Sequence, residues 1–279
     1  MPLLQLHLCR AFDGLRALWE HPRCRTTVGW VLILTFALAL LGIEGARQGW
    51  IPDPHQRLPR SHFYAISSAF TVLLYVEVID LVFSLSRSFS DAVGKQFEIF
   101  ALILLRQPFK ELTVLPEPLA WPEDPGPLKV IAASALAALT IFAVLQGFRR
   151  TLQHPPLSPD SRETQGFVGA KKVLALGLLA FLVTNGLRHL GLYLTGAPAG
   201  HFFDTFYTVL VFCDVLIVLL SLRHSHRFAV VFRNSAFVMA TVLLRLALTA
   251  PPLQRAALGV GAALYVLGIA VLYQRENAT

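Results

Sequence analysis

Long apolar runs separated by short polar connections dominate this sequence. Most of these runs approach the roughly 20 mainly apolar residues that a helix needs to cross a bilayer. The short run at 92–105 is assigned from its repeat at 228–244. The pattern therefore predicts an all-α integral membrane protein with about eight transmembrane helices. The predicted spans are residues 27–46, 62–85, 92–105, 128–148, 170–194, 202–222, 228–244 and 253–273.

One stretch of the chain, residues 62–106, recurs as residues 201–245. Its Thr-Val-Leu at 71–73, Ser-Leu at 84–85 and Leu-Leu-Arg at 104–106 return at 208–210, 221–222 and 243–245. The repeat predicts an internal duplication, with four-helix membrane units at residues 27–150 and 169–279 and a cytoplasmic linker at 151–168. An even number of spans per unit makes the two units parallel in the membrane.

The repeat aligns an acid with an acid and an arginine with an arginine inside the apolar runs. Glu77 aligns with Asp214, and Arg106 aligns with Arg245. With turns near residues 91 and 229, each acid and its arginine lie at one depth on antiparallel helices, about 22 Å from the turn at roughly 1.5 Å per residue. Pairing removes much of the cost of an ion in lipid. The pairs therefore predict either a structural ion pair or a proton or ion pathway.

The remaining polar residues near the spans are secondary candidates. Glu44 can pair with Arg47 three residues later on the same helical face. Asp80 has no acidic counterpart in the second copy, and we expect Lys95 or a wet crevice beside it. The other candidates are His62, His201, Arg188 and His189. Two facing histidines could hold a haem, but most of the nine lie in loops, so we predict no cofactor and no metal.

Residues 1–26 form a separate N-terminal segment. Leu8, Phe12, Leu15 and Trp19 recur at helical spacing among charged residues. This pattern predicts a cytoplasmic amphipathic helix on the membrane surface.

Composition supports a membrane protein and argues against nucleic-acid binding. Of the 279 residues, 55% are hydrophobic and only 15% charged, and the mean hydropathy is +0.59. The net charge of +7 comes from arginines dispersed along short loops, whereas a nucleic-acid surface needs a dense basic patch. Of the 24 Lys and Arg residues, 15 fall on one side of the predicted topology. The positive-inside rule then places both termini in the cytoplasm.

A resemblance to a known family follows from the same motifs. The run Leu-Tyr-Val-Glu-Val-Ile at 74–79, followed about thirty residues later by Leu104-Leu105-Arg106, resembles the bacterial phosphate-starvation-inducible PsiE family. Residues 212–216 and 242–246 of the second half match as well, and Leu-Gly-Ile-Glu at 41–44 is also similar. The resemblance covers most of residues 28–148 and 170–274. It implies a tandem pair of four-span units in the bacterial inner membrane.

The sequence contains no catalytic motif: no glycine-rich phosphate loop, no HExxH, no CxxC and no nucleophile elbow. We therefore expect a non-enzymatic polytopic inner-membrane protein. The interpretation favoured by the sequence is a stress-response component or an accessory subunit of a membrane complex, with lipid and other membrane proteins as partners. The alternative is a proton or ion channel or transporter that uses the duplicated pairs. A haem-dependent membrane redox protein is a third hypothesis.

Overall fold

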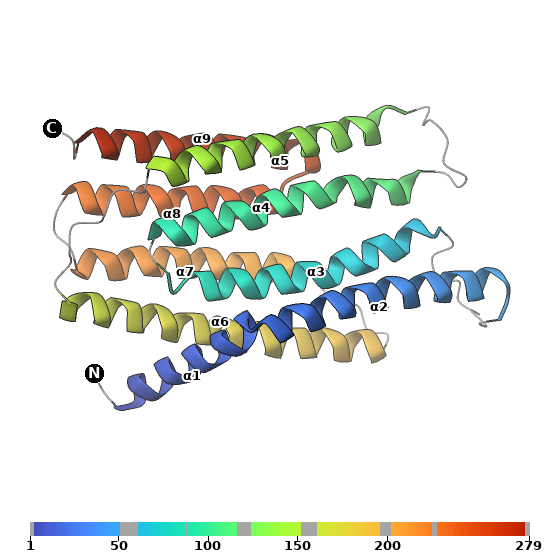
Figure 1. The fold of residues 1–279 in the computed structure, drawn as a ribbon, viewed down its shortest axis with the longest axis horizontal. Helices are drawn as coiled ribbons and strands as arrows, with labels where there is room; N and C mark the ends of the chain where they lie inside the picture. Colours follow the sequence, from blue (N-terminus) through green and yellow to red (C-terminus); the bar gives the residue numbers. More distant parts are fainter. Residues whose placement is uncertain are drawn as a thin grey trace.

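The protein is a bundle of long helices. The computed structural model describes residues 3–50, 61–87, 89–115, 124–151, 161–195, 202–224 and 228–276, and these ranges contain no strand. The helices are α1 (Leu3–Glu20), α2 (Pro22–Arg47), α3 (Phe63–Ser84), α4 (Phe89–Glu111), α5 (Gly126–Thr151), α6 (Ser161–Thr195), α7 (Phe202–His224), α8 (Phe228–Thr249) and α9 (Pro252–Glu276), with a 3₁₀ turn at Leu112–Val114 (Figure 1).

Every predicted span coincides with a helix, from α2 to α9, so the all-α prediction is confirmed. Six helical segments within the described residues are long and apolar enough to cross a membrane. They are Pro22–Arg47, Phe63–Ser84, Gly126–Thr151, Gly166–His189, Val231–Thr249 and Pro252–Gln274. Helix α4 is not among them, because every stretch of it long enough to cross a membrane contains Lys95, Glu98 and Arg106. In α7 the described apolar part, Thr205–Leu220, is shorter.

Part of the linker predicted at residues 151–168 is helical. Helix α6 begins at Ser161, so residues 161–168 are helical, and residues 152–160 lie outside the described part. Arg162, Glu163 and Gln165 are good helix formers. They extend the apolar helix toward its N-terminus, although their polarity gave them the character of a connection.

The helices pack in chain order within each half. In the first half α2 packs on α3, α3 on α4 and α4 on α5, and in the second half α6 to α9 follow the same order. The halves meet where α5 packs on α9, α4 on α8 and α3 on α6. Corresponding helices run in the same direction, and the second half is displaced along the bundle toward the end where α1 begins and α9 ends (Figure 1).

Two apolar clusters form the interior. The first joins α4, α5, α8 and α9, and it combines rings such as Phe100, Phe148 and Phe237 with many alanines. Small residues allow close approach of helix backbones in membrane proteins. Gly259 of α9 illustrates this, because a Cβ built on it would overlap the ring of Phe100. The second cluster joins α1, α3, α4, α6 and α7.

Helix α1 confirms the amphipathic helix predicted for the N-terminal segment. It ends at Glu20, and α2 begins at Pro22. Its apolar face packs on the bundle, where Phe12 is fully buried and contacts the ring of Phe83. Leu18 stays 70% exposed. The location of α1 at a membrane surface stays a prediction.

Candidate functional site

The structure brings Glu77 and Arg106 together. Nη1 of Arg106 lies 3.0 Å from Oε2 of Glu77, and both side chains are almost fully buried. The same nitrogen donates to the backbone carbonyl of Phe70 at 3.1 Å. Within the described residues, neither carboxylate oxygen of Glu77 has a partner with hydrogen-bond geometry. The pair is therefore held by charge, and the carboxylate keeps its capacity to accept further hydrogen bonds or a proton.

The equal depth predicted for these two residues is wrong, because the turn between the helices comes earlier than residue 91. Helix α3 ends at Ser84 and α4 begins at Phe89. The hydroxyl of Ser84 donates to the Leu81 carbonyl at this end. Glu77 is thus seven residues from the end of α3, and Arg106 is seventeen from the beginning of α4. Helical side chains lean toward their own N-terminus. In these antiparallel helices the two long side chains therefore lean toward one another and close the offset.

The second pair, Asp214 and Arg245, is more deeply buried. Nε of Arg245 lies 3.6 Å from Oδ2 of Asp214, and the two side chains are 3% and 4% exposed. Nη2 of Arg245 also donates to Oε1 of Gln96 at 3.1 Å. Gln96 belongs to α4, so this pair ties the second half of the bundle to the first. Gln96 precedes Arg106, the aligned partner of Arg245, by ten residues, which corresponds to about 15 Å of helix rise. The direction of this offset agrees with the displacement of the second half toward the end where α1 begins (Figure 1).

Three further polar residues join the pairs, and sequence reasoning missed them. Tyr207 of α7 is buried and lies within electrostatic reach of Arg106, Arg245 and Arg255. Arg255 of α9 places Nη1 3.4 Å from Oε1 of Gln107. Among the described residues, the two pairs and Arg255 thus bring three arginines and two acids together, on α3, α4, α7, α8 and α9.

The sequence did carry a signal for two of these residues. Tyr207 aligns with Phe70 at the spacing of 137 residues that relates Thr71 to Thr208, so one copy has a hydroxyl where the other has none. Arg255 interrupts an apolar run three residues after Pro252. Gln107 is a plain polar neighbour of Arg106, and nothing in the sequence distinguished it.

A small cavity lies against the second pair. Its polar lining consists of Gln96, Tyr207 and Arg245, and its volume is about 10 Å³. This is about the space that one water molecule needs. The cavity therefore allows a single bridging water beside these three groups.

The secondary candidate Glu44 lies apart from the buried pairs, at the end of α2. Its carboxylate contacts Nε2 of His62 at 3.0 Å and the amide of Gln48 at 2.5 Å. Nη1 of Arg47 lies 2.9 Å from Nδ1 of His62. Because a guanidinium only donates, Nδ1 accepts, and Nε2 carries the proton that it donates to Glu44. The expected role of Glu44 as the partner of Arg47 alone is thus too narrow, because His62 joins the two.

Three of the remaining secondary candidates are Arg188, His189 and His201. Arg188 is exposed and His189 is half-buried late in α6. His201 lies outside the described residues. Across the described ranges, no group of three His, Cys, Asp or Glu side chains is arranged to hold a metal ion.

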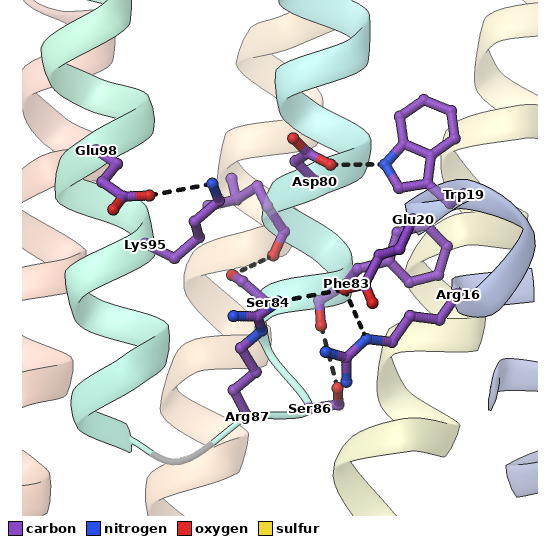
Figure 2. A network of polar contacts seen from close by, with 11 residues as sticks. Arg16, Trp19, Glu20, Asp80, Phe83, Ser84, Ser86, Arg87, Lys95 and Glu98 are labelled. Atoms are coloured by element: carbon purple, nitrogen blue, oxygen red, sulfur yellow. Dashed lines mark hydrogen bonds and ion pairs between the residues drawn. The ribbon is translucent and has the colours of Figure 1, made fainter. Parts of the chain in front are cut away.

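Asp80 belongs to a polar network beside the first pair, where side chains at the end of α1 reach α3 (Figure 2). Nε1 of Trp19 donates to Oδ1 of Asp80 at 2.6 Å. Lys95, the partner expected for Asp80, instead lies 3.0 Å from Glu98, which also pairs with Arg149 of α5. The expectation of Lys95 is therefore wrong. Sequence spacing carries no information on how α1 docks, so only the structure identifies Trp19 as the partner of Asp80.

Glu20, one residue after Trp19, anchors the end of α1. Its Oε1 accepts from Arg16 at 3.0 Å and from Arg87 at 3.2 Å. Burial raises the pKa of Glu20, but the hydrogen bonds and charges of the two arginines outweigh it, so the pKa lies below its ordinary value of 4.5.

Comparison with known protein families, with curated proteins and with solved structures finds no match for this chain. The resemblance to the PsiE family accordingly stays a prediction.

Proposed function

We propose that this chain is a non-enzymatic multi-pass membrane protein that moves protons across the bilayer through Glu77. In this proposal α4 and α7 also cross the membrane, which gives eight spans in two parallel, duplicated four-helix units. The identical packing order of the two halves and the common direction of their corresponding helices (Figure 1) support this topology. The positive-inside bias supports cytoplasmic termini in a bacterial inner membrane.

The observation that carries the proposal is the state of the Glu77 carboxylate. It is 5% exposed, faces Arg106 at 3.0 Å, and has no hydrogen bond from any described residue. A purely structural carboxylate in an apolar interior is expected to have its oxygens satisfied, because an unmet buried acceptor costs about 1–3 kcal/mol. Unused acceptor capacity beside a fixed cation suits an acid that exchanges a proton. Ionisable residues inside membrane helices commonly belong to such relays.

The surrounding groups supply neighbours for that exchange. Tyr207 has a hydroxyl that both donates and accepts, and Arg106, Arg255 and Gln107 follow toward the far end of α4. Arg106 and Arg255 also repel one another. When Glu77 gains a proton, Arg106 loses its counterion, so the charge of the arginines favours release of that proton.

The experiment that tests the proposal uses purified protein in liposomes loaded with a pH-sensitive dye. Wild type, Glu77→Gln, Arg106→Gln and the exchange Glu77→Arg/Arg106→Glu are compared for proton flux under an imposed pH gradient and for melting temperature. The proposal expects flux in wild type and at least a tenfold loss in Glu77→Gln that still folds. Wild type without flux, or Glu77→Gln with full flux, refutes it.

The second candidate function is that of an accessory membrane protein whose buried charges are architectural. The bond from Arg245 to Gln96 favours it, because this contact joins α8 to α4 across the two halves. The same experiment decides between the candidates. A silent wild type, with stability lost in both single variants and recovered in the exchange, supports the architectural role.

A further inference from the structure

Asp80 stands one helical turn from Glu77 on α3. Residues three apart share a face of a helix, with Cβ atoms about 5–6 Å apart, and the two acids lie within electrostatic reach of each other. Asp80 is the later of the two, so it lies nearer to Ser84, where α3 ends. Unlike Glu77, it is only half-buried. It is therefore the acid between the buried carboxylate and the solvent at this end of the bundle.

The contact made by Asp80 differs from those of the other interior acids. Glu77 and Asp214 each face an arginine, whereas the hydrogen bond to Asp80 in the described residues comes from the neutral indole of Trp19, at 2.6 Å. The indole N–H donates a hydrogen bond but carries no charge, so it does not neutralise the Asp80 carboxylate. Among the described residues, Asp80 is thus held in place without a counterion.

Helix α1 packs on α6, and from there it brings the indole of Trp19 to Asp80 of α3. Phe12 is buried against Phe83, and the ring of Trp19 also lies 6.3 Å from that of Phe83. Glu20 pairs with Arg87, next to the turn after α3, and Nζ of Lys172 in α6 contacts Asp13 at 2.7 Å. Figure 2 shows Trp19 reaching Asp80 from α1 while Lys95 and Glu98 pair on α4.

From this geometry we infer that Asp80 is the proton-exchange residue between Glu77 and the aqueous phase at the α1 end of the bundle, and that Trp19 positions and covers it. The inference rests on the proposed proton pathway and names its entry. The step is a transfer between oxygens: the O–H bond of the Asp80 carboxylic acid breaks and an O–H bond forms on Glu77. Asp80 is left ionised, and water at the α1 end returns the proton. The reverse sequence releases a proton at that end.

The charged groups around Asp80 suit this role. On its own helix it faces the acid Glu77. The charged residues of the network on α4 are Lys95 and Glu98, which are engaged with each other. On α1 and in the turn they are Arg16, Glu20 and Arg87, which form their own group. These contacts leave the Asp80 carboxylate bonded to Trp19, so the loss of that single bond would uncover it.

The test uses the full chain in liposomes loaded with a pH-sensitive dye, with Asp80→Asn, Asp80→Glu, Trp19→Phe and Glu77→Gln beside wild type. The inference expects Asp80→Asn to lose at least tenfold in flux with its melting temperature near that of wild type, and Asp80→Glu to keep most of the flux. Azide, a small weak acid that carries protons, should restore flux in Asp80→Asn when added at the α1 side, relative to protein-free vesicles and to Glu77→Gln with the same azide. Trp19→Phe keeps the ring contact with Phe83 but loses the donor, and should raise the flux several-fold.

The outcomes separate the inference from the function on which it rests. Full flux in Asp80→Asn together with a silent Glu77→Gln overturns the role of Asp80 and leaves the pathway standing. A loss in Asp80→Asn that azide and Asp80→Glu both fail to restore assigns Asp80 to structure and also overturns the inference. Unchanged proton flux in Trp19→Phe overturns the covering role assigned to Trp19. If Glu77→Gln conducts like wild type, the proposed function itself fails, and the entry residue fails with it.

Discussion

The most direct test of the buried charges is the change Asp214→Asn. It removes the anion that faces Arg245 and leaves a guanidinium with 3% of its side chain exposed. The amide that replaces the carboxylate is nearly the same size, so packing is preserved and only the charge is lost. Gln96 still accepts one hydrogen bond from Arg245, but it carries no charge.

The expected cost follows from the burial of both partners. Breaking a buried ion pair by removing one partner typically costs about 3–5 kcal/mol, because the other charge is left uncompensated. For a domain of 150–250 residues, about 1 kcal/mol shifts the melting temperature by roughly 2–4 °C, so we expect a fall of about 6–20 °C. The double variant Asp214→Asn/Arg245→Gln removes both charges and should recover a large part of the loss.

The assay is thermal unfolding in one detergent or nanodisc preparation. Asp124→Asn is the matched control, since Asp124 is exposed and its bond to the Gly126 amide can be kept by the asparagine carbonyl. We expect the control to melt within about 1 °C of wild type, as surface substitutions usually do. A folded Asp214→Asn protein that melts as high as the control, or a double variant less stable than Asp214→Asn, would refute the reasoning.

Two further predictions concern packing and pH. Gly259→Ala places a Cβ against the ring of Phe100, whereas Gly261→Ala has open space around it. Overpacking typically costs about 1–3 kcal/mol, so the Gly259→Ala protein should melt several degrees below wild type and the Gly261→Ala protein at or above it. Equal melting temperatures of the two variants would contradict the close approach of α9 to α4. Because the pKa of Glu20 lies below 4.5, its contribution to the docking of α1 is present above that pH and is lost as the pH falls below it. The difference in melting temperature between wild type and Glu20→Gln should therefore shrink as the pH falls from 6 to 3. The difference will be small, since the Glu20 side chain is 42% exposed and solvent screens the pair. A difference that grows toward acid pH would contradict a stabilising role of the ionised Glu20 carboxylate.

The sequence by itself determined the helices of this protein and its principal charges. Apolar runs of membrane-spanning length could form little else, because a backbone in lipid must satisfy its hydrogen bonds internally, and α2 to α9 follow the predicted spans. Residues repeated at spacings of 137 and 139 singled out Glu77, Arg106, Asp214 and Arg245. Long side chains on neighbouring antiparallel helices could pair even where the predicted turn was several residues out of place.

Only the tertiary structure decided which elements meet. The docking of α1 places Trp19 on Asp80, which are 61 residues apart in the chain, and no periodicity encodes such a contact. The displacement of the two halves sets Arg245 beside Gln96, 149 residues away, and brings Tyr207 within electrostatic reach of three arginines. These contacts depend on how the side chains of whole helices interlock, which depends on the shapes of both surfaces together. Local patterns fix the face of a helix, but the partner of that face is chosen by packing.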